Sequence, residues 1–302
     1  MCGIVGLLVK NPALRAQLGE LTVPMLIGMT ERGPDSAGLA VFTEPLPENE
    51  RKINLYSGLT EDGADFNWHG LAHELATHLG IEAKIDAIGN HAVLSFGLAP
   101  EPVKRWIQEH HPKLHILSTG RSIDLYKDTG RPGEVASRYN FGSLTGTHVV
   151  GHTRMATESA VTPDRAHPFT AGEDFCLVHN GSLSNPNSIR RQLEPLGISF
   201  QTDNDTEAAC RFLEWRMREG DDLETALQKS FDELDGFYTF LMGTTDELAI
   251  IRDAFACKPA VVAETDEYVA IASEFRSLAK LPDVKHATIF EPKPEEMYVW
   301  RV

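Results

Sequence analysis

The chain opens with Met1-Cys2-Gly3-Ile4-Val5-Gly6-Leu7-Leu8-Val9. The apolar run from Gly3 to Val9, punctuated by glycine, predicts a buried strand that begins almost at the chain terminus. Residues 13–30 follow with leucine and methionine at helical spacing, a polar turn occupies 31–36, and a second apolar strand is predicted over 37–42. The chain is therefore expected to open strand–helix–strand.

Composition narrows the classes of function. The 302 residues are 42% hydrophobic and 24% charged, with a formal net charge of −16. Such an acidic chain is not expected to bind nucleic acid or an anionic membrane, because neither surface would attract it. Apolar stretches fall short of the 18 or so residues that cross a bilayer, and no basic segment precedes the first apolar run, so a cytoplasmic protein is expected.

The four cysteines are Cys2, Cys176, Cys210 and Cys257, and no two of them form a C-x-x-C pair. Their separation supports neither a zinc site nor a disulfide framework. No sequence pattern for a metal or an organic cofactor is found. The protein is therefore expected to need neither a metal ion nor an organic cofactor.

The remaining pattern is α+β. From residue 148 onward strands are predicted at 148–152, 175–179, 238–243, 248–253, 260–263 and 268–272, and helices at 188–196, 206–219 and 222–234. Short hairpin connections between the strands favour a layered fold with helices on the outer faces. We expect one domain over 1–302, with a small α+β insertion at about 44–147, where helices are predicted at 71–79 and 101–110 and strands at 91–96, 114–118 and 123–126.

Cys2 is the first candidate for chemistry. Removal of Met1 would leave one residue that carries both a thiol and a free α-amine. With pKa values of about 8.5 and about 7.7–8.0, the thiol is a ready nucleophile and the amine a usable base near neutral pH. The alternative is that Cys2 packs as a small hydrophobic residue.

Three further sites make a coherent set with Cys2. Arg154 is expected at the end of a strand, Asn180-Gly181 directly after another, and Asp205 where a helix starts. Each has an ordinary explanation as a solvated charge, a turn or a helix cap. Together they would suit an amino-acid amide, with Arg154 for the carboxylate, Asp205 for the ammonium, and Asn180 with Gly181 for the oxyanion.

Several motifs occur in the order found in one family. They are Met1-Cys2-Gly3-Ile4-Val5-Gly6, Arg32-Gly33-Pro34-Asp35-Ser36-Ala37-Gly38, Gly151-His152-Thr153-Arg154, His179-Asn180-Gly181, Asp205-Thr206-Glu207, Asp235-Gly236-Phe237-Tyr238, Arg252-Asp253, Lys258-Pro259 and Ala272-Ser273-Glu274. This chain resembles the class II glutamine amidotransferases, whose nucleophile is the N-terminal residue. The resemblance covers roughly 1–42 and 148–299.

The resemblance implies a four-layer αββα sandwich of the N-terminal nucleophile (Ntn) hydrolase type and L-glutamine as the substrate. Cys2 would attack the side-chain amide, Asn180 and Gly181 would form the oxyanion hole, and Arg154 and Asp205 would hold the substrate carboxylate and ammonium. Thr157 is a weaker candidate beside Arg154. Arg32 would orient the N-terminus, although a purely structural role is an equal alternative.

The chain shows no synthase domain, so the acceptor of the ammonia is expected on another polypeptide. The opening block is most similar to stand-alone amidotransferase subunits of split glutamate synthase-like systems, such as N-methylglutamate synthase. Two alternatives remain: an amide hydrolase with another substrate, and a non-catalytic regulatory subunit of the same fold. The pairing of Arg154 with Asp205 counts against the first, and the intact residue set counts against the second.

Overall fold

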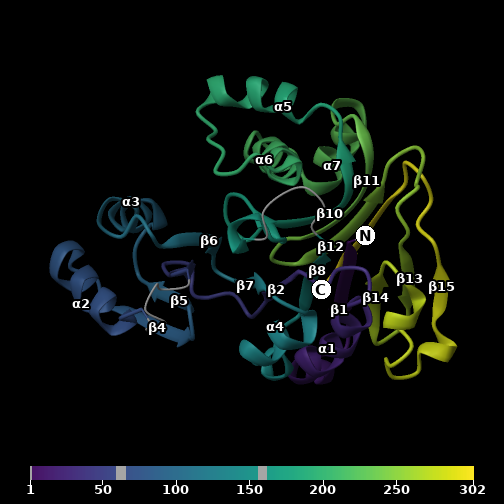
Figure 1. Ribbon diagram of the computed structural model, residues 1–302, viewed down its shortest axis with the longest axis horizontal. Coiled ribbons are helices and arrows are strands. Elements are labelled where there is room, and N and C mark those ends of the chain that lie inside the picture. Colours follow the sequence, from purple (N-terminus) through teal and green to yellow (C-terminus); the bar gives the residue numbers. More distant parts are fainter. Residues whose placement is uncertain (1, 59–65, 156–161) are drawn as a thin grey trace.

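The computed structural model describes residues 2–58, 66–155 and 162–302 of the chain (Figure 1). Two antiparallel sheets form its centre. The seven-stranded sheet has the order β15 (Thr288–Phe290), β13 (Val261–Glu264), β14 (Tyr268–Ala272), β1 (Gly3–Val9), β8 (His148–Arg154), β2 (Ser36–Phe42), β7 (Ile123–Thr129). The five-stranded sheet has the order β16 (Met297–Arg301), β12 (Glu247–Arg252), β11 (Gly236–Gly243), β10 (Cys176–Leu183), β9 (Phe169–Thr170).

Strand β1 shows how the layers form. Its alternate residues Val5 and Leu7 pack in one hydrophobic cluster with α1 (Leu18–Gly28) and α4 (Pro132–Arg138). Ile4 and Leu8 point the other way, into a cluster shared with the five-stranded sheet. Because successive side chains of a strand point to opposite faces, a strand buried on both sides must be apolar throughout. This explains the unbroken apolar run at the start of the sequence.

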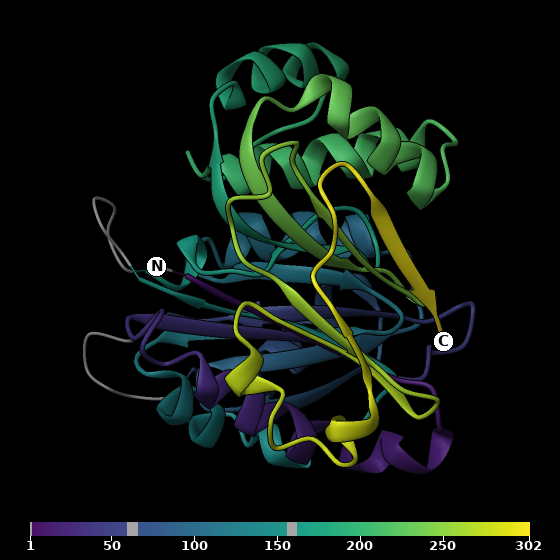
Figure 2. The same cartoon turned by 90° about the vertical axis from the view of Figure 1, so that its right-hand side faces the viewer.

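Helices α5 (Pro186–Leu193), α6 (Asp205–Arg218) and α7 (Leu223–Glu233) cover the outer face of the five-stranded sheet through a third cluster. Figure 2 shows the two sheets stacked between these green helices and the purple α1 on the far side. The predicted four-layer αββα sandwich is confirmed. One detail differs: instead of one helix over 13–30, a 3₁₀ turn (Pro12–Gln17) precedes α1.

The described residues between 51 and 120 (51–58 and 66–120) form a unit that we call the side module, on the left in Figure 1. Its four-stranded sheet has the order β4 (Ala83–Ile88), β5 (His91–Phe96), β3 (Arg51–Tyr56), β6 (His115–Gly120). With α2 (Trp68–Leu79) and α3 (Pro100–His110) it has a hydrophobic cluster of its own. By contrast β7 and α4, which lie inside the predicted 44–147 range, belong to the central sheet and its helical layer. The division into one domain with an insertion stays a prediction.

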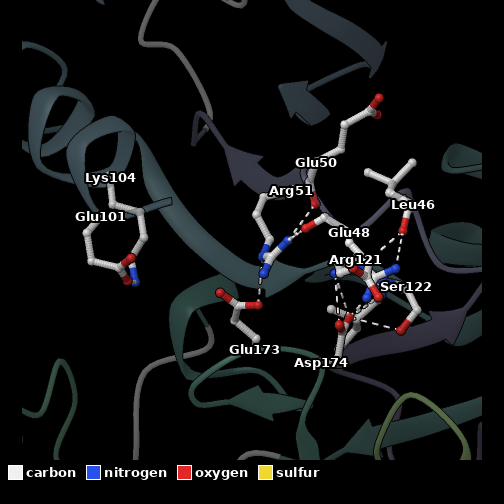
Figure 3. A network of polar contacts seen from close by, with 11 residues as sticks. Leu46, Glu48, Glu50, Arg51, Glu101, Lys104, Arg121, Ser122, Glu173 and Asp174 are labelled. Atoms are coloured by element: carbon white, nitrogen blue, oxygen red, sulfur yellow. Dashed lines mark hydrogen bonds and ion pairs between the residues drawn. The ribbon is translucent and has the colours of Figure 1, made fainter. Parts of the chain in front are cut away.

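A polar network fastens the side module to the segment that leads into β10 (Figure 3). The buried carboxylate of Asp174 accepts hydrogen bonds from three successive backbone N–H groups, those of Arg121, Ser122 and Ile123, and from the Ser122 hydroxyl. Arg51 at the start of β3 forms an ion pair with Glu173 at 2.8 Å. Several hydrogen bonds to a single carboxylate fix its position. The side module is thus anchored next to β10.

No helix within the described part of the chain combines the length and the apolar character needed to cross a membrane.

Candidate active site

Cys2 lies immediately before β1, half-buried, at the edge where β8 ends. The register pairs Gly3 with Thr153, which places Cys2 beside Arg154 and Met155. The Cys2 Sγ lies 4.0 Å from the Met155 carbonyl oxygen. Met1 is outside the described residues, so the α-amine that its removal would expose is not part of this geometry.

Arg32 holds the backbone of Cys2. Its Nε donates to the Cys2 carbonyl oxygen at 2.9 Å, and its Nη1 pairs with Glu274 Oε1 at 3.0 Å. The Arg32 side chain is nearly buried, so this charge-assisted contact is not freely screened by solvent. The structure therefore places Arg32 against the backbone of Cys2, and its orienting role stays a prediction.

Asn180 is the second group on the Cys2 carbonyl oxygen. Its Nδ2 donates to that oxygen at 3.2 Å and to Ser273 Oγ at 3.1 Å. Sequence analysis expected Asn180-Gly181 to follow a strand, but both lie within β10, where Asn180 pairs with Thr239 of β11. The position inside a strand fixes the amide more firmly than a turn would.

His152 locks the orientation of that amide. Its Nε2 lies 3.2 Å from both Asn180 Oδ1 and the His179 carbonyl oxygen. Burial lowers the pKa of His152 to about 3, so the imidazole is neutral at pH 7. Since both neighbours of Nε2 are acceptors, Nε2 carries the proton and donates. With Oδ1 held in this way, Nδ2 must face Cys2.

Gly181 occupies a position that only glycine fits. Its φ is +143°, and a Cβ there would stand 1.9 Å from the Phe237 carbonyl oxygen and 2.8 Å from His179 Nε2. Gly33 is limited by space alone, because a Cβ there would be 2.5 Å from the Arg154 N. These two close approaches hold β10 and the turn that contains Arg32 against their neighbours.

Arg154 is the last residue of β8 and is 8% exposed. Its carbonyl oxygen accepts a hydrogen bond from the Asp35 N at 3.1 Å. The strand thus delivers the arginine to the same edge as Cys2. Thr157, the weaker candidate beside it, lies outside the described residues.

Asp205 is the first residue of α6, and Asn204 is the helix cap. One carboxylate oxygen of Asp205 accepts from the Leu183 N of β10 at 2.9 Å, and the other lies 3.7 Å from His179 Nδ1. Burial by itself raises the pKa of the Asp205 carboxyl, but His179 and the backbone donors of Leu183 and Thr206 prevail, so its pKa lies below the usual value. Asp205 is therefore an anion at neutral pH, partly exposed and attached to the strand that carries Asn180.

Thr206, the next residue of α6, connects this helix to two buried histidines that lie behind the site. Its hydroxyl lies 2.8 Å from His167 Nε2 and 3.1 Å from His179 Nδ1. Burial lowers the pKa of His167 well below its ordinary value. The ring of His167 lies against that of His152, with centroids 4.2 Å apart. The buried, neutral rings of His152 and His167 therefore lie directly behind this polar edge.

The predicted residues do not all contact one another. Cys2, Arg32 and Asn180 meet directly, Arg154 adjoins Cys2 through the strand register, and Asp205 reaches the same strand through Leu183. No role was predicted from the sequence for His152 and Ser273. Both lie inside motifs that were quoted, but only the fold shows that each contacts Asn180. Within the described ranges no group of three or more His, Cys, Asp or Glu side chains could hold a metal ion.

Solved structures share this arrangement of layers. The glutamine phosphoribosylpyrophosphate amidotransferase from B. subtilis, complexed with ADP and GMP, superposes with a TM-score of 0.61 at 20% sequence identity, over 99% of this chain and 49% of that one. A structure described as the allosteric regulatory enzyme of purine biosynthesis gives a TM-score of 0.64 at 20% identity, over 99% and 47%. The chain thus spans about half of each of these proteins. The fold is that of the Ntn-hydrolase amidotransferases.

Sequence comparison identifies the family. Residues 152–280 match the model of a glutamine amidotransferase domain. The chain is 47% identical to the glutamine amidotransferase-like protein GlxB of Rhizobium meliloti (strain 1021), over 99% of this chain and 98% of that protein. It is 33% identical to a putative glutamine amidotransferase of Methanothermobacter thermautotrophicus, over 99% of each chain. The protein belongs to the glutamine amidotransferase family.

Proposed function

We propose that this protein is a glutamine-hydrolysing amidotransferase subunit in which Cys2, freed of Met1, is the nucleophile. The observation that carries the proposal is the pair of contacts on the Cys2 carbonyl oxygen, from Arg32 at 2.9 Å and Asn180 at 3.2 Å. They fix the backbone of a residue at the start of the chain, where fraying would otherwise be expected. A fixed backbone is what a terminal nucleophile needs.

In this mechanism the Cys2 α-amine takes the thiol proton, and the thiolate attacks the side-chain carbonyl carbon of glutamine. Asn180 and Gly181 stabilise the resulting oxyanion. The tetrahedral intermediate collapses with loss of the amide nitrogen, which receives the proton from the amine and leaves as ammonia. Water then hydrolyses the glutamyl thioester, which releases glutamate and restores Cys2.

Substrate binding divides between two charges. Arg154 would take the α-carboxylate with its guanidinium, and the ionised Asp205 would take the α-ammonium. The Asn180 amide already donates to Cys2 O and Ser273 Oγ, so substrate must replace one of these acceptors. Thr157 stays a proposed auxiliary contact next to Arg154.

We further propose that the ammonia passes to a synthase on a separate chain, of the glutamate synthase-like kind that includes N-methylglutamate synthase. The chain spans 98% of GlxB and 99% of the methanogen protein, so these relatives contain little besides the matched region. An acceptor site on another polypeptide is consistent with that length. Co-purification of a synthase chain with the tagged native protein would support this part, and recovery of the protein alone would count against it.

The test of the nucleophile is the intact mass of the protein before and after treatment with 6-diazo-5-oxo-L-norleucine, a glutamine mimic. We expect loss of Met1, one adduct, and protection by glutamine. Cys2→Ala should abolish the adduct. Cys257→Ala is the matched control, because Cys257 is an exposed free thiol whereas Cys176 and Cys210 are buried. An adduct that persists in Cys2→Ala would refute the proposal, and a processed protein that stays unlabelled with its partner present would favour a regulatory subunit.

A further inference from the structure

A cavity of about 410 Å³ lies where the side module meets the sandwich. Its wall comes from α3 and β6 of the side module, from β7 and β9, and from the first half of α6 with the segment that precedes it. It is separate from the candidate active site, since neither Cys2, Arg154, Asn180 nor Asp205 lines it. Its size falls within the range of about 300–1,000 Å³ that is typical of small-molecule sites.

Three cations from three different elements line this cavity: Lys104 of α3, Lys127 of β7 and Arg211 of α6. Glu207 is the one carboxylate among the described lining residues. It accepts hydrogen bonds from the backbone of Gln201 and Thr202 at 2.8 and 2.7 Å, and its Oε1 lies 3.6 Å from Arg211 Nη2, so it offsets one of the three positive charges. The whole chain has a net charge of −16, whereas this lining contains more positive than negative side chains. A concave wall with this charge favours an anion.

The wall also carries polar groups that the protein leaves unused. Ser118 Oγ and Arg211 Nε are both buried and have no hydrogen-bond partner. A buried donor without an acceptor destabilises the folded protein. An oxygen-rich ligand beside these side chains would supply the missing acceptors.

Lys104 and Lys127 are placed differently. Figure 3 shows the Lys104 ammonium beside the Glu101 carboxylate, at 3.5 Å, in a partly exposed pair that contributes little and can exchange partners. Lys127 is buried, its ammonium donates to the carbonyl oxygens of Ala166 and Pro168, and it lies over the Phe169 ring. Lys127 is therefore fixed in the cavity wall, whereas the Lys104 side chain can turn toward a ligand.

The opposite rim is fixed by the network of Figure 3. Gly172 lines the cavity, and the next two residues, Glu173 and Asp174, are the ones that bind Arg51 and the β6–β7 turn. The two parts of the wall are thus held in register before any ligand arrives. Preorganisation of this kind lowers the cost of binding.

We propose that this cavity binds a small organic oxyanion, carrying carboxylate or phosphate, and that the bound anion acts on the glutamine site through the first turn of α6. Glu207 and Arg211 face the cavity from the same helix that begins with Asp205. Thr206, which lies between Asp205 and Glu207, contacts His179, the neighbour of Asn180. The second part rests on the proposed function, and the first does not.

The binding test is isothermal titration calorimetry on the full chain with citrate as the carboxylate probe and glycerol 3-phosphate as the phosphate probe, against chloride at matched ionic strength. We expect saturable binding of at least one probe, weakened about tenfold or more in the double variant Lys104→Met/Arg211→Met. The control Lys84→Met/Arg218→Met removes two exposed cations from the same module and helix, and should bind as the wild type does. If the double variant does not fold, Lys104→Met alone gives the comparison.

Absence of saturable binding of both probes to the wild type, or equal binding by the double variant, would overturn the site. For the coupling, a saturating probe should change the KM for glutamine by about fivefold or more, and the double variant should show no change. An unchanged KM with the probe bound would overturn the coupling. Calorimetry needs no catalysis, so binding without labelling of Cys2 would refute only the proposed function, and labelling without binding would refute only the cavity.

Discussion

Replacement of His152 by phenylalanine tests the assignment of the Asn180 amide. The ring keeps its shape, but the Nε2–H that reaches Asn180 Oδ1 and the His179 carbonyl oxygen at 3.2 Å is lost. Leaving buried acceptors without a donor costs about 1–3 kcal/mol. If that cost falls on the orientation of the amide beside Cys2, the rate of labelling by the glutamine mimic should fall about tenfold to a hundredfold.

His152→Gln provides the matched comparison, because its side-chain N–H can donate where Nε2 did. We expect it to recover most of the labelling rate, and to keep the pH profile of the wild type. The pKa of His152 is about 3, so the wild-type profile above pH 5 should not report its titration. Labelling at the wild-type rate in His152→Phe would refute the reasoning, as would a glutamine variant as slow as the phenylalanine one when both remain folded.

Three other perturbations follow from the geometry. Asp205→Asn keeps an acceptor for the Leu183 N but removes the negative charge. The KM for glutamine should therefore rise about tenfold, which corresponds to the loss of one charge-assisted hydrogen bond. The kcat should change less. Gly181→Ala puts a Cβ 1.9 Å from the Phe237 carbonyl oxygen and should abolish labelling or folding. Burial lowers the pKa of His148 to about 3, so His148→Gln should reduce the loss of stability in acid.

The sign of the last effect follows from proton binding. Folded His148 stays neutral, whereas the unfolded chain takes up a proton below about pH 6.5, so stability is lost as pH falls from there towards about 3. One such histidine contributes a slope of about 1.4 kcal/mol per pH unit within that window. Denaturant titrations between pH 7 and 4.5 measure it, and an unaltered slope in His148→Gln would contradict the account.

Each variant has a control nearby. Asp203→Asn removes an exposed carboxylate two residues before Asp205 and should leave the KM unchanged. Ser182→Ala alters the exposed residue after Gly181 and should label normally. His286→Gln changes an exposed histidine and should keep the wild-type acid slope. If a control variant showed the same effect as the variant it is matched to, the physical reason given for that effect would be wrong.

Strands of the central sheets could be predicted where their residues are apolar without interruption. Gly3–Val9 is apolar throughout since both of its faces are covered, and the predicted strand has the observed bounds. Strand β3 was not predicted because Lys52 and Asn54 interrupt its apolar pattern. Both are nonetheless buried, Lys52 in an ion pair with Asp124 at 2.7 Å and Asn54 in a hydrogen bond to the Ile123 carbonyl oxygen. Partners that distant in sequence cannot be read from the strand itself.

The same limit applies to the site. Cys2, Arg32 and Asn180 could be named from motifs, and the structure brings them into contact. The amide's own supports, His152 and Ser273, are 28 and 93 residues away from Asn180 along the chain. Only the packing of the sheet that contains β8 and β14 against the sheet that contains β10 makes them neighbours. The roles assigned to the site residues remain proposals.

The most direct measurement of the central claim is an acid-quenched single turnover with glutamine itself, followed by mass spectrometry of the N-terminal peptide. We expect a peptide that begins with Cys2 and carries a glutamyl group as a thioester, which hydroxylamine removes. We also expect that ammonia is released before the adduct decays. Ammonia release without any adduct on Cys2, or with the adduct on another residue, would contradict the account.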